Sequence, residues 1–151
     1  MVLLMRLGML FLGRSWTVAI ALFCAALLGC GSGKPWGTVP VSGKVTYEDG
    51  SLIPVKSMRI SFAPQTPPID AKTFPRQGTA GVNVADGTFD KITTYKFADG
   101  LIPGKHKVVL IAMDNGRDLS NKIPKEYTTA GTTPIEIDTA DSPLEIKIHK
   151  P

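Results

Sequence analysis

The chain has 151 residues, with 17 basic and 13 acidic side chains, two histidines and two cysteines. The basic residues are scattered as singles, and Lys105-His106-Lys107 is their tightest group. Proteins that bind the phosphates of nucleic acids need clustered positive charge. The composition therefore argues against nucleic acid as a partner, and the length fits one ordinary domain with a short leader.

The N-terminus has the layout of an export signal. Arg6 and Arg14 precede an uncharged, mostly apolar run over residues 15–28, like the positive and hydrophobic regions of a signal peptide. The run ends in Leu27-Leu28-Gly29-Cys30, which resembles the lipobox of bacterial lipoproteins. The resemblance implies cleavage between Gly29 and Cys30, a diacylglyceryl thioether on Cys30, and often a further acyl chain on its amino group.

An uncleaved transmembrane helix is the alternative to this signal. Residues 2–28 are long enough to cross a bilayer about 30 Å thick. However, a charge such as Arg6 or Arg14 inside a span costs about 2.5–3.5 kcal/mol. The sequence therefore favours the cleaved lipoprotein.

Cleavage would divide the chain into a signal peptide over residues 1–29, a lipidated cysteine and flexible tether over residues 30–38, and a domain over residues 39–151. Without Arg6 and Arg14, the 17 basic residues fall to 15, against 13 acidic ones. Cys24 leaves with the signal and the sulfur of Cys30 carries lipid, so no disulfide can form within the domain. A hydrophobic core must then stabilise the domain. The lipoprotein signal predicts a location in the cell envelope, with the domain facing the periplasm or the exterior.

Beyond the tether, apolar and polar residues alternate in the manner of β-strands. The first strand turns Val39, Val41, Val45 and Tyr47 to one face and ends at Asp49-Gly50; the second turns Met58, Ile60 and Phe62 inward and ends at Pro64. A surface loop with four prolines follows over residues 64–75. Further strands are expected over residues 79–84, 88–94, 107–113, 134–139 and 143–149, with an extended or irregular piece over residues 123–127.

The run over residues 107–113 (KVVLIAM) is apolar on both faces, as in a central strand that is covered on two sides. We expect Val109, Ile111, Ile137 and Ile146 to form the core. Short strands separated by turns, without helices, predict an all-β fold, a seven-stranded antiparallel β-sandwich of prealbumin-like or immunoglobulin-like type.

Three motifs in the domain resemble the carboxypeptidase regulatory-like domain, which is a transthyretin-like sandwich. They are Val41-Ser42-Gly43-Lys44-Val45 with Asp49-Gly50, then Asp86-Gly87-Thr88-Phe89, then the run from Leu101 to Val108 (LIPGKHKV). His106 stands where that family commonly has tyrosine. Residues 123–127 and 133–137 also resemble the small secreted lipoproteins of planctomycete-type bacteria. These motifs imply an architecture more than an activity.

Little in the sequence indicates catalysis or a metal. His106 and His149 are expected to be solvent-facing strand residues, and neither has the convergent ligands that a metal site needs. A serine nucleophile set could be drawn from Ser57, His106 and Asp90, but the sequence has no Gly-x-Ser-x-Gly elbow to present the serine. The C-terminus also lacks the tail of the hydroxyisourate hydrolases. We therefore expect no enzyme, no cofactor and no metal, although calcium at Asp86 and Asp90, or at Asp114 and Asp118, is an alternative.

The candidate ligand contacts are Tyr95, Phe97 and Tyr127, which could form an aromatic platform for a glycan. Alternatively, Phe97 and Tyr127 belong to the core or to the edge of the sandwich. The loops over residues 64–75 and 114–121 are the expected contact surfaces. The sequence thus predicts a non-enzymatic, lipid-anchored envelope protein, a structural, adhesive or assembly module whose partners are the membrane and an envelope protein or glycan. A carbohydrate- or peptide-binding module of the same fold is the second hypothesis, and an unrecognised hydrolase is the third.

Overall fold

The computed structural model describes residues 34–114, 117–118 and 121–151, without the side chains of residues 113–118. Lys34–Pro151 forms one compact unit. The predicted signal peptide, the cleavage site and Cys30 lie outside the described residues, as do parts of the expected contact loop over residues 114–121. Among the described residues, no helix is long and apolar enough to span a membrane.

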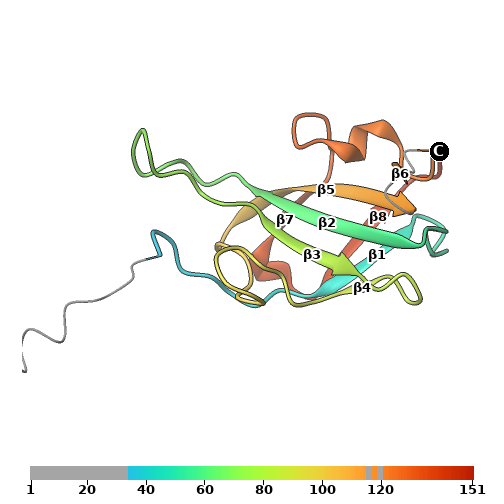
Figure 1. Ribbon diagram of the computed structural model, residues 1–151, viewed down its shortest axis with the longest axis horizontal. Helices are drawn as coiled ribbons and strands as arrows, with labels where there is room; N and C mark the ends of the chain where they lie inside the picture. The colour runs from blue at the N-terminus through green and yellow to red at the C-terminus, as the bar shows by residue number, and fades with distance from the viewer. Residues whose placement is uncertain (1–33, 115–116, 119–120) are drawn as a thin grey trace, which may run out of the picture. The chain divides into compact units, whose positions relative to one another are not determined.

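The described chain consists of strands in two sheets, without an α-helix among these residues (Figure 1). The three-stranded sheet has the order β4 (Thr88–Phe89), β1 (Gly43–Tyr47), β8 (Leu144–Ile148). The five-stranded sheet has the order β3 (Gly78–Val82), β2 (Ser57–Pro64), β5 (Lys105–Asp114), β6 (Arg117–Asp118), and β7 (Glu136–Asp138) also pairs with β5. The 3-10 turns η2 (Lys125–Thr128) and η3 (Thr139–Asp141) flank β7. The expected all-β class is confirmed.

The three-stranded sheet is mixed, which differs from the expected antiparallel pairing. β1 and β8 run parallel, from Gly43 opposite Leu144 to Tyr47 opposite Ile148, whereas the other strand pairs are antiparallel. Parallel neighbours need a long connection, and nearly the whole domain lies between these two strands. Alternation within each strand carries no information about this direction.

Turn chemistry ends the strands where the sequence predicts. Asp86 accepts hydrogen bonds from the backbone N–H and the hydroxyl of Thr88, at 2.8 and 2.7 Å. Gly87 has a φ of +80°, and a Cβ there would lie 2.5 Å from the carbonyl oxygen of Val45, so only glycine fits. The strand expected over residues 88–94 is shorter than predicted, because Lys91 has a φ of +46° and turns the chain after Phe89.

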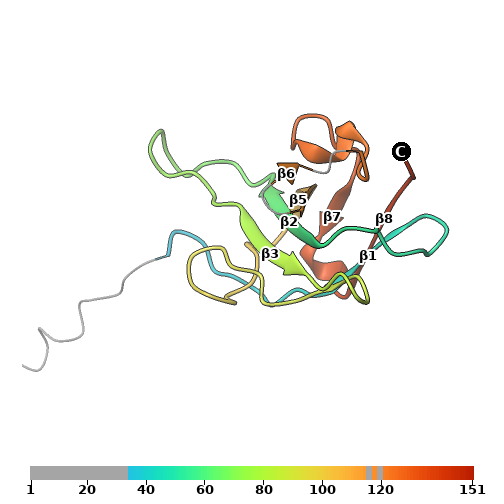
Figure 2. The same ribbon diagram turned by 45° about the vertical axis from the view of Figure 1, so that its right-hand side comes forward.

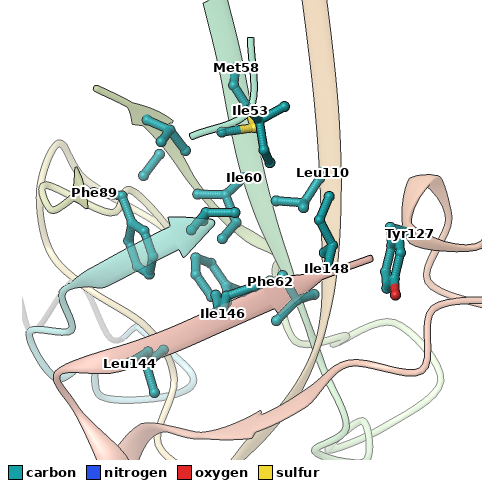
Figure 3. Close-up of a cluster of buried hydrophobic side chains, with 14 of the residues drawn as sticks. Ile53, Met58, Ile60, Phe62, Phe89, Leu110, Tyr127, Leu144, Ile146 and Ile148 are labelled. Carbon is teal, nitrogen blue, oxygen red and sulfur yellow. The ribbon is translucent and has the colours of Figure 1, made fainter. Parts of the chain in front are cut away.

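Both sheets contribute to one cluster of buried side chains (Figure 3). β1, β2 and β8 place their alternating apolar residues in it as predicted; they are Val45, Tyr47, Met58, Ile60, Phe62, Leu144, Ile146 and Ile148. The side of β5 that faces this core was predicted wrongly. Val108, Leu110 and Ala112 are in the cluster, whereas Val109 is buried on the opposite face and Ile111 is half-buried there. Since both faces of β5 are apolar, its sequence did not distinguish them.

Two further segments can be compared with expectation. The loop after Pro64 is exposed over most of its length, as predicted (green in Figure 1). The piece expected to be extended or irregular over residues 123–127 is extended at Pro124 and then forms η2, with Tyr127 buried beneath it. Ile137 is only partly buried and packs against the edge of the core.

Candidate functional site

The three aromatic residues of the predicted platform are not brought together. Tyr95 is half-buried and Phe97 exposed on the loop over residues 93–100, while Tyr127 is buried in η2. Val39 pairs with Leu101 ahead of β1, whereas Tyr127 contacts His149, just beyond the end of β8 that lies beside Tyr47. The loop and η2 thus lie at opposite ends of β1 (Figures 1 and 2).

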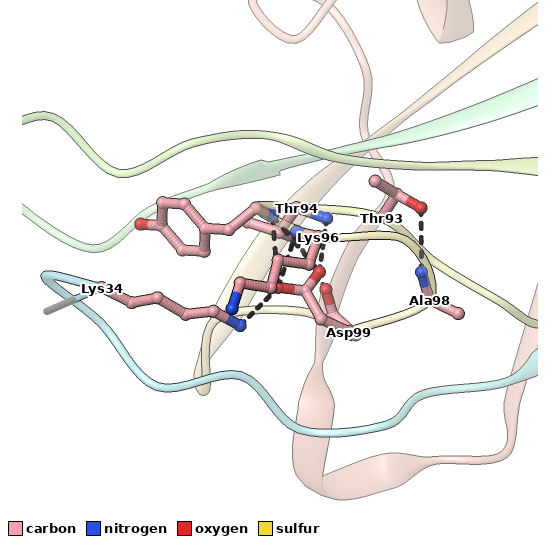
Figure 4. Close-up of polar contacts among 8 residues, drawn as sticks. Lys34, Thr93, Thr94, Lys96, Ala98 and Asp99 are labelled. Atoms are coloured by element: carbon pink, nitrogen blue, oxygen red, sulfur yellow. Dashed lines mark hydrogen bonds and ion pairs between the residues drawn. The ribbon is translucent and has the colours of Figure 1, made fainter. Parts of the chain in front are cut away.

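The loop over residues 93–100 is organised around the carboxylate of Asp99 (Figure 4). Asp99 Oδ1 accepts the backbone N–H of Thr94 at 2.9 Å, and Oδ2 accepts that of Lys96 at 3.1 Å. The Nζ of Lys34 donates to Oδ2 at 2.7 Å, across 65 residues of sequence. The Asp99 side chain is only 10 % exposed. This single carboxylate therefore shapes the loop and ties the tether to it.

Two opposing effects determine the pKa of the Asp99 carboxyl. Burial alone would raise the pKa of its carboxyl, but the hydrogen bonds from Lys34 and from the backbone of Thr94, Lys96 and Tyr95 outweigh burial and lower the pKa from 3.8 to about 2. The carboxylate is consequently ionised at neutral pH, which keeps the pair with Lys34 intact.

The ring of Tyr95 connects the segment that carries Arg76 to the tether and to the loop over residues 93–100. The Nζ of Lys34 lies 5.8 Å from the centroid of its ring, and the guanidinium of Arg76 lies 5.5 Å from it. Both cations are within the range of a cation–π contact. The tyrosine hydroxyl is buried and has no hydrogen-bond partner among the described residues. We call Lys34, Arg76, Tyr95 and Asp99 the tether-end cluster.

The structure overturns the prediction for His106. Its side chain is fully buried on the core face of β5, and its ring lies edge-on to Phe62, with centroids 6.4 Å apart. Nε2 lies 2.8 Å from the carbonyl oxygen of Ile102, so Nε2 carries the proton and donates. Nδ1 has no partner among the described residues. A ring enclosed in this way has a structural role, because no substrate reaches it.

Two of the three residues proposed as a nucleophile set are far apart. Ser57 lies opposite Met113 and His106 lies opposite Pro64, at the two ends of the ladder between β2 and β5. At a rise of about 3.3 Å per residue, seven residues of strand separate them by about 23 Å. The hydrolase hypothesis therefore loses its candidate residues.

The second histidine lies in a chain of polar groups that the sequence did not indicate. His149 Nδ1 is 2.7 Å from the hydroxyl of Tyr127, and its Nε2 is 3.0 Å from Glu126 Oε1. The order of acid, imidazole and hydroxyl resembles a catalytic relay. However, the hydroxyl is part-buried, and it also lies 3.5 Å from the backbone nitrogen of His149. The arrangement fixes the end of β8 to η2.

A shallow cleft of about 610 Å³ lies where the three-stranded sheet meets the end of β3. Phe89 and Leu144 are among its apolar lining residues, and Lys44, Asn83, Asp90 and Glu145 are among its polar ones. Lys44 points outward, as the alternation of β1 predicts. The cleft offers hydrogen-bonding groups beside an apolar surface.

Of the carboxylates proposed for calcium, Asp86 lies in a turn, and Asp90 is exposed and lines the cleft. The oxygens of Asp86 accept hydrogen bonds from Thr88 and from Asn83 Nδ2. The side chains of Asp114 and Asp118 are outside the description. Within the described part of the chain, no three histidine, cysteine, aspartate or glutamate side chains are grouped for a metal.

Comparisons with protein-family models, curated proteins and solved structures gave no match to this chain.

Proposed function

We propose that this protein is a lipid-anchored β-sandwich of the cell envelope, which acts by contact as a structural, adhesive or assembly module. The Lys34–Asp99 ion pair carries the proposal furthest. It fixes the tether to the folded domain only four residues after Cys30, the predicted site of acylation. A domain held so close to its anchor is suited to work at the membrane surface.

The proposed fold within the all-β class is the carboxypeptidase regulatory-like sandwich. Two sheets that share one buried cluster support it, as do the Asp-Gly turns at Asp49 and Asp86, where Gly50 and Gly87 both have positive φ. The position of His106 adds support. Its side chain faces the core, where the ring of the tyrosine common in that family could occupy the same space.

Action by contact is supported by the state of the chemically capable side chains. His106 is enclosed in the core, and His149 is held between Glu126 and Tyr127. Neither is positioned beside a nucleophile in a cavity, which is the arrangement that general-base catalysis needs.

A carbohydrate- or peptide-binding module remains the second proposal, and the cleft is the observation that favours it. Its polar groups, which include Lys44, Asn83, Asp90 and Glu145, are of the kinds that bind hydroxyl and amide groups. The apolar lining from Phe89 and Leu144 gives a surface on which a ring or an aliphatic side chain can pack.

The lipid anchor is tested by replacing each cysteine in turn. We expect Cys30→Ala to abolish labelling with radioactive palmitate and to leave precursor or soluble protein, because the thiol that accepts lipid is gone. Cys24→Ala is the matched control and should keep normal labelling and membrane fractionation, since Cys24 is removed with the signal. Undiminished palmitate incorporation in Cys30→Ala would contradict the anchor.

A further inference from the structure

Most of the large exposed apolar side chains lie on two loops of the domain. The large hydrophobic residues that are exposed in the described part of the chain are Leu52, Ile69, Phe74 and Phe97, at 38, 60, 61 and 82 %. Three of them lie on the loops over residues 65–77 and 93–100. Both loops extend toward the end of the domain at which the chain from residue 34 begins (Figures 1 and 2).

The tether-end cluster holds these loops and the tether together. Arg76, at the end of one loop, contacts the ring of Tyr95 in the other, and Lys34 contacts both that ring and Asp99. These contacts link the three segments from which the exposed side chains extend.

The two loops and the tether carry a net positive charge. They have four basic side chains, Lys34, Lys72, Arg76 and Lys96, and two acidic ones, Asp70 and Asp99. Asp99 is neutralised by Lys34, and Asp70 accepts hydrogen bonds from the backbone of Lys72 and Thr73 at 2.7 and 2.8 Å. Aromatic and apolar tips between basic side chains suit the interfacial region of a bilayer, where rings lie among headgroups and cations meet phosphates.

The length of the tether limits how far this end can be from the membrane. Lys34 is the fourth residue after Cys30, and even a fully extended chain spans at most about 3.6 Å per residue, or about 14 Å over these four steps. Because Lys34 is tied to Asp99, the loop that carries Phe97 stays within a short distance of the acylated cysteine.

We propose that the loops carrying Ile69, Phe74 and Phe97 dock onto the phospholipid surface that holds the acyl chains of Cys30. The apolar tips enter the interfacial region, and Lys72, Arg76 and Lys96 face the headgroup phosphates. This inference rests on the proposed lipid anchor. It adds that the domain has a fixed orientation on the bilayer, with the loop between β1 and β2 directed away from it.

The experiment uses the full, processed protein, purified from membranes and reconstituted into vesicles that contain phosphatidylglycerol. Phe97→Cys is labelled with an environment-sensitive dye, and Leu52→Cys serves as the matched control in the loop after β1. Some of the lipids carry a nitroxide near the headgroup. We expect the dye at residue 97 to shift to the blue and lose emission to the nitroxide, while the dye at residue 52 does neither.

A second variant tests whether the apolar tips cause the docking. A dye at Ile69→Cys should be quenched in the same vesicles, and adding Phe97→Asp should relieve that quenching, because a buried carboxylate opposes insertion. Equal emission from positions 97 and 52, or quenching at position 69 that Phe97→Asp leaves unchanged, would overturn the proposal. Protection of the dye at residue 97 only after an envelope extract is added would also overturn it, in favour of a protein partner.

Failure of the anchor gives a different result. The parent chain without an added cysteine should take up no dye, because Cys24 is removed and the sulfur of Cys30 is acylated. Dye on the parent chain would show that Cys30 is free, which contradicts the lipid anchor. An unlabelled parent chain together with unquenched positions 69 and 97 would retain the anchor and overturn the docking alone.

Discussion

At the scale of single residues, Asp99 has the largest structural consequence. One carboxylate accepts three backbone N–H groups of its own loop and the ammonium of Lys34. Charge-assisted hydrogen bonds of this kind are stronger than neutral ones. The pH dependence of stability should therefore carry the signature of this residue.

The pKa of Asp99 is about 2 in the folded protein, against a usual value of 3.8. Its stabilisation is therefore fully present above about pH 4 and is lost as the pH falls toward 2, because the unfolded chain takes up the proton first. The full effect is on the order of 2 kcal/mol. The measurement uses a truncated protein of residues 31–151, which lacks Cys30. We expect Asp99→Asn to lower its free energy of unfolding at pH 6, and to lower it much less at pH 2.

Urea unfolding at the two pH values measures this difference. Asp141→Asn, at an exposed position on η3, is the control and should change stability little at either pH. A loss of stability in Asp99→Asn that is equal at pH 6 and pH 2 would mean that the carboxylate charge is not what matters.

At the scale of elements, β5 is the central strand of its sheet, and its two faces differ in burial. Leu110 is fully buried in the core, whereas the neighbouring Ile111 is half-buried on the other face. The predicted assignment was the reverse. It relied on apolar character alone, which β5 shows on both sides.

Truncation of the two neighbours measures the difference between the faces. We expect Leu110→Ala to lower the free energy of unfolding by about 2–5 kcal/mol, because it removes buried surface and leaves a cavity. Ile111→Ala, which removes a side chain of the same size from a partly exposed position, should cost clearly less. Equal costs in chemical denaturation would show that both faces of β5 are packed equally well.

At the scale of the whole molecule, the two sheets depend on each other. Their side chains share one buried cluster, and the first and last strands pair directly. Assembly of the two sheets therefore depends on contacts between residues that are far apart in sequence.

One shared core predicts one cooperative unfolding transition. We expect Ile60→Ala, in the five-stranded sheet, and Ile146→Ala, in the three-stranded sheet, each to lower the unfolding midpoint while a single transition is kept. Circular dichroism and the fluorescence of Trp36, the sole tryptophan after residue 29, should report the same midpoint. Two separate transitions in either variant would show that the sheets fold independently.

Local order in this protein is readable from its sequence. The alternation of β1, β2 and β8, and the Asp-Gly turns after β1 and before β4, required only side-chain period and the backbone freedom of glycine. Those rules act between residues a few positions apart, and the structure follows them.

Tertiary structure alone decided the rest. It chose the parallel pairing of β1 with β8 and enclosed His106. It also separated Tyr127 from Tyr95 and brought Lys34 to Asp99 across 65 residues. Each of these outcomes depends on which distant segments meet, and no local pattern specifies that. The tether-end cluster therefore became visible only in three dimensions, although every residue in it is an ordinary one in the sequence.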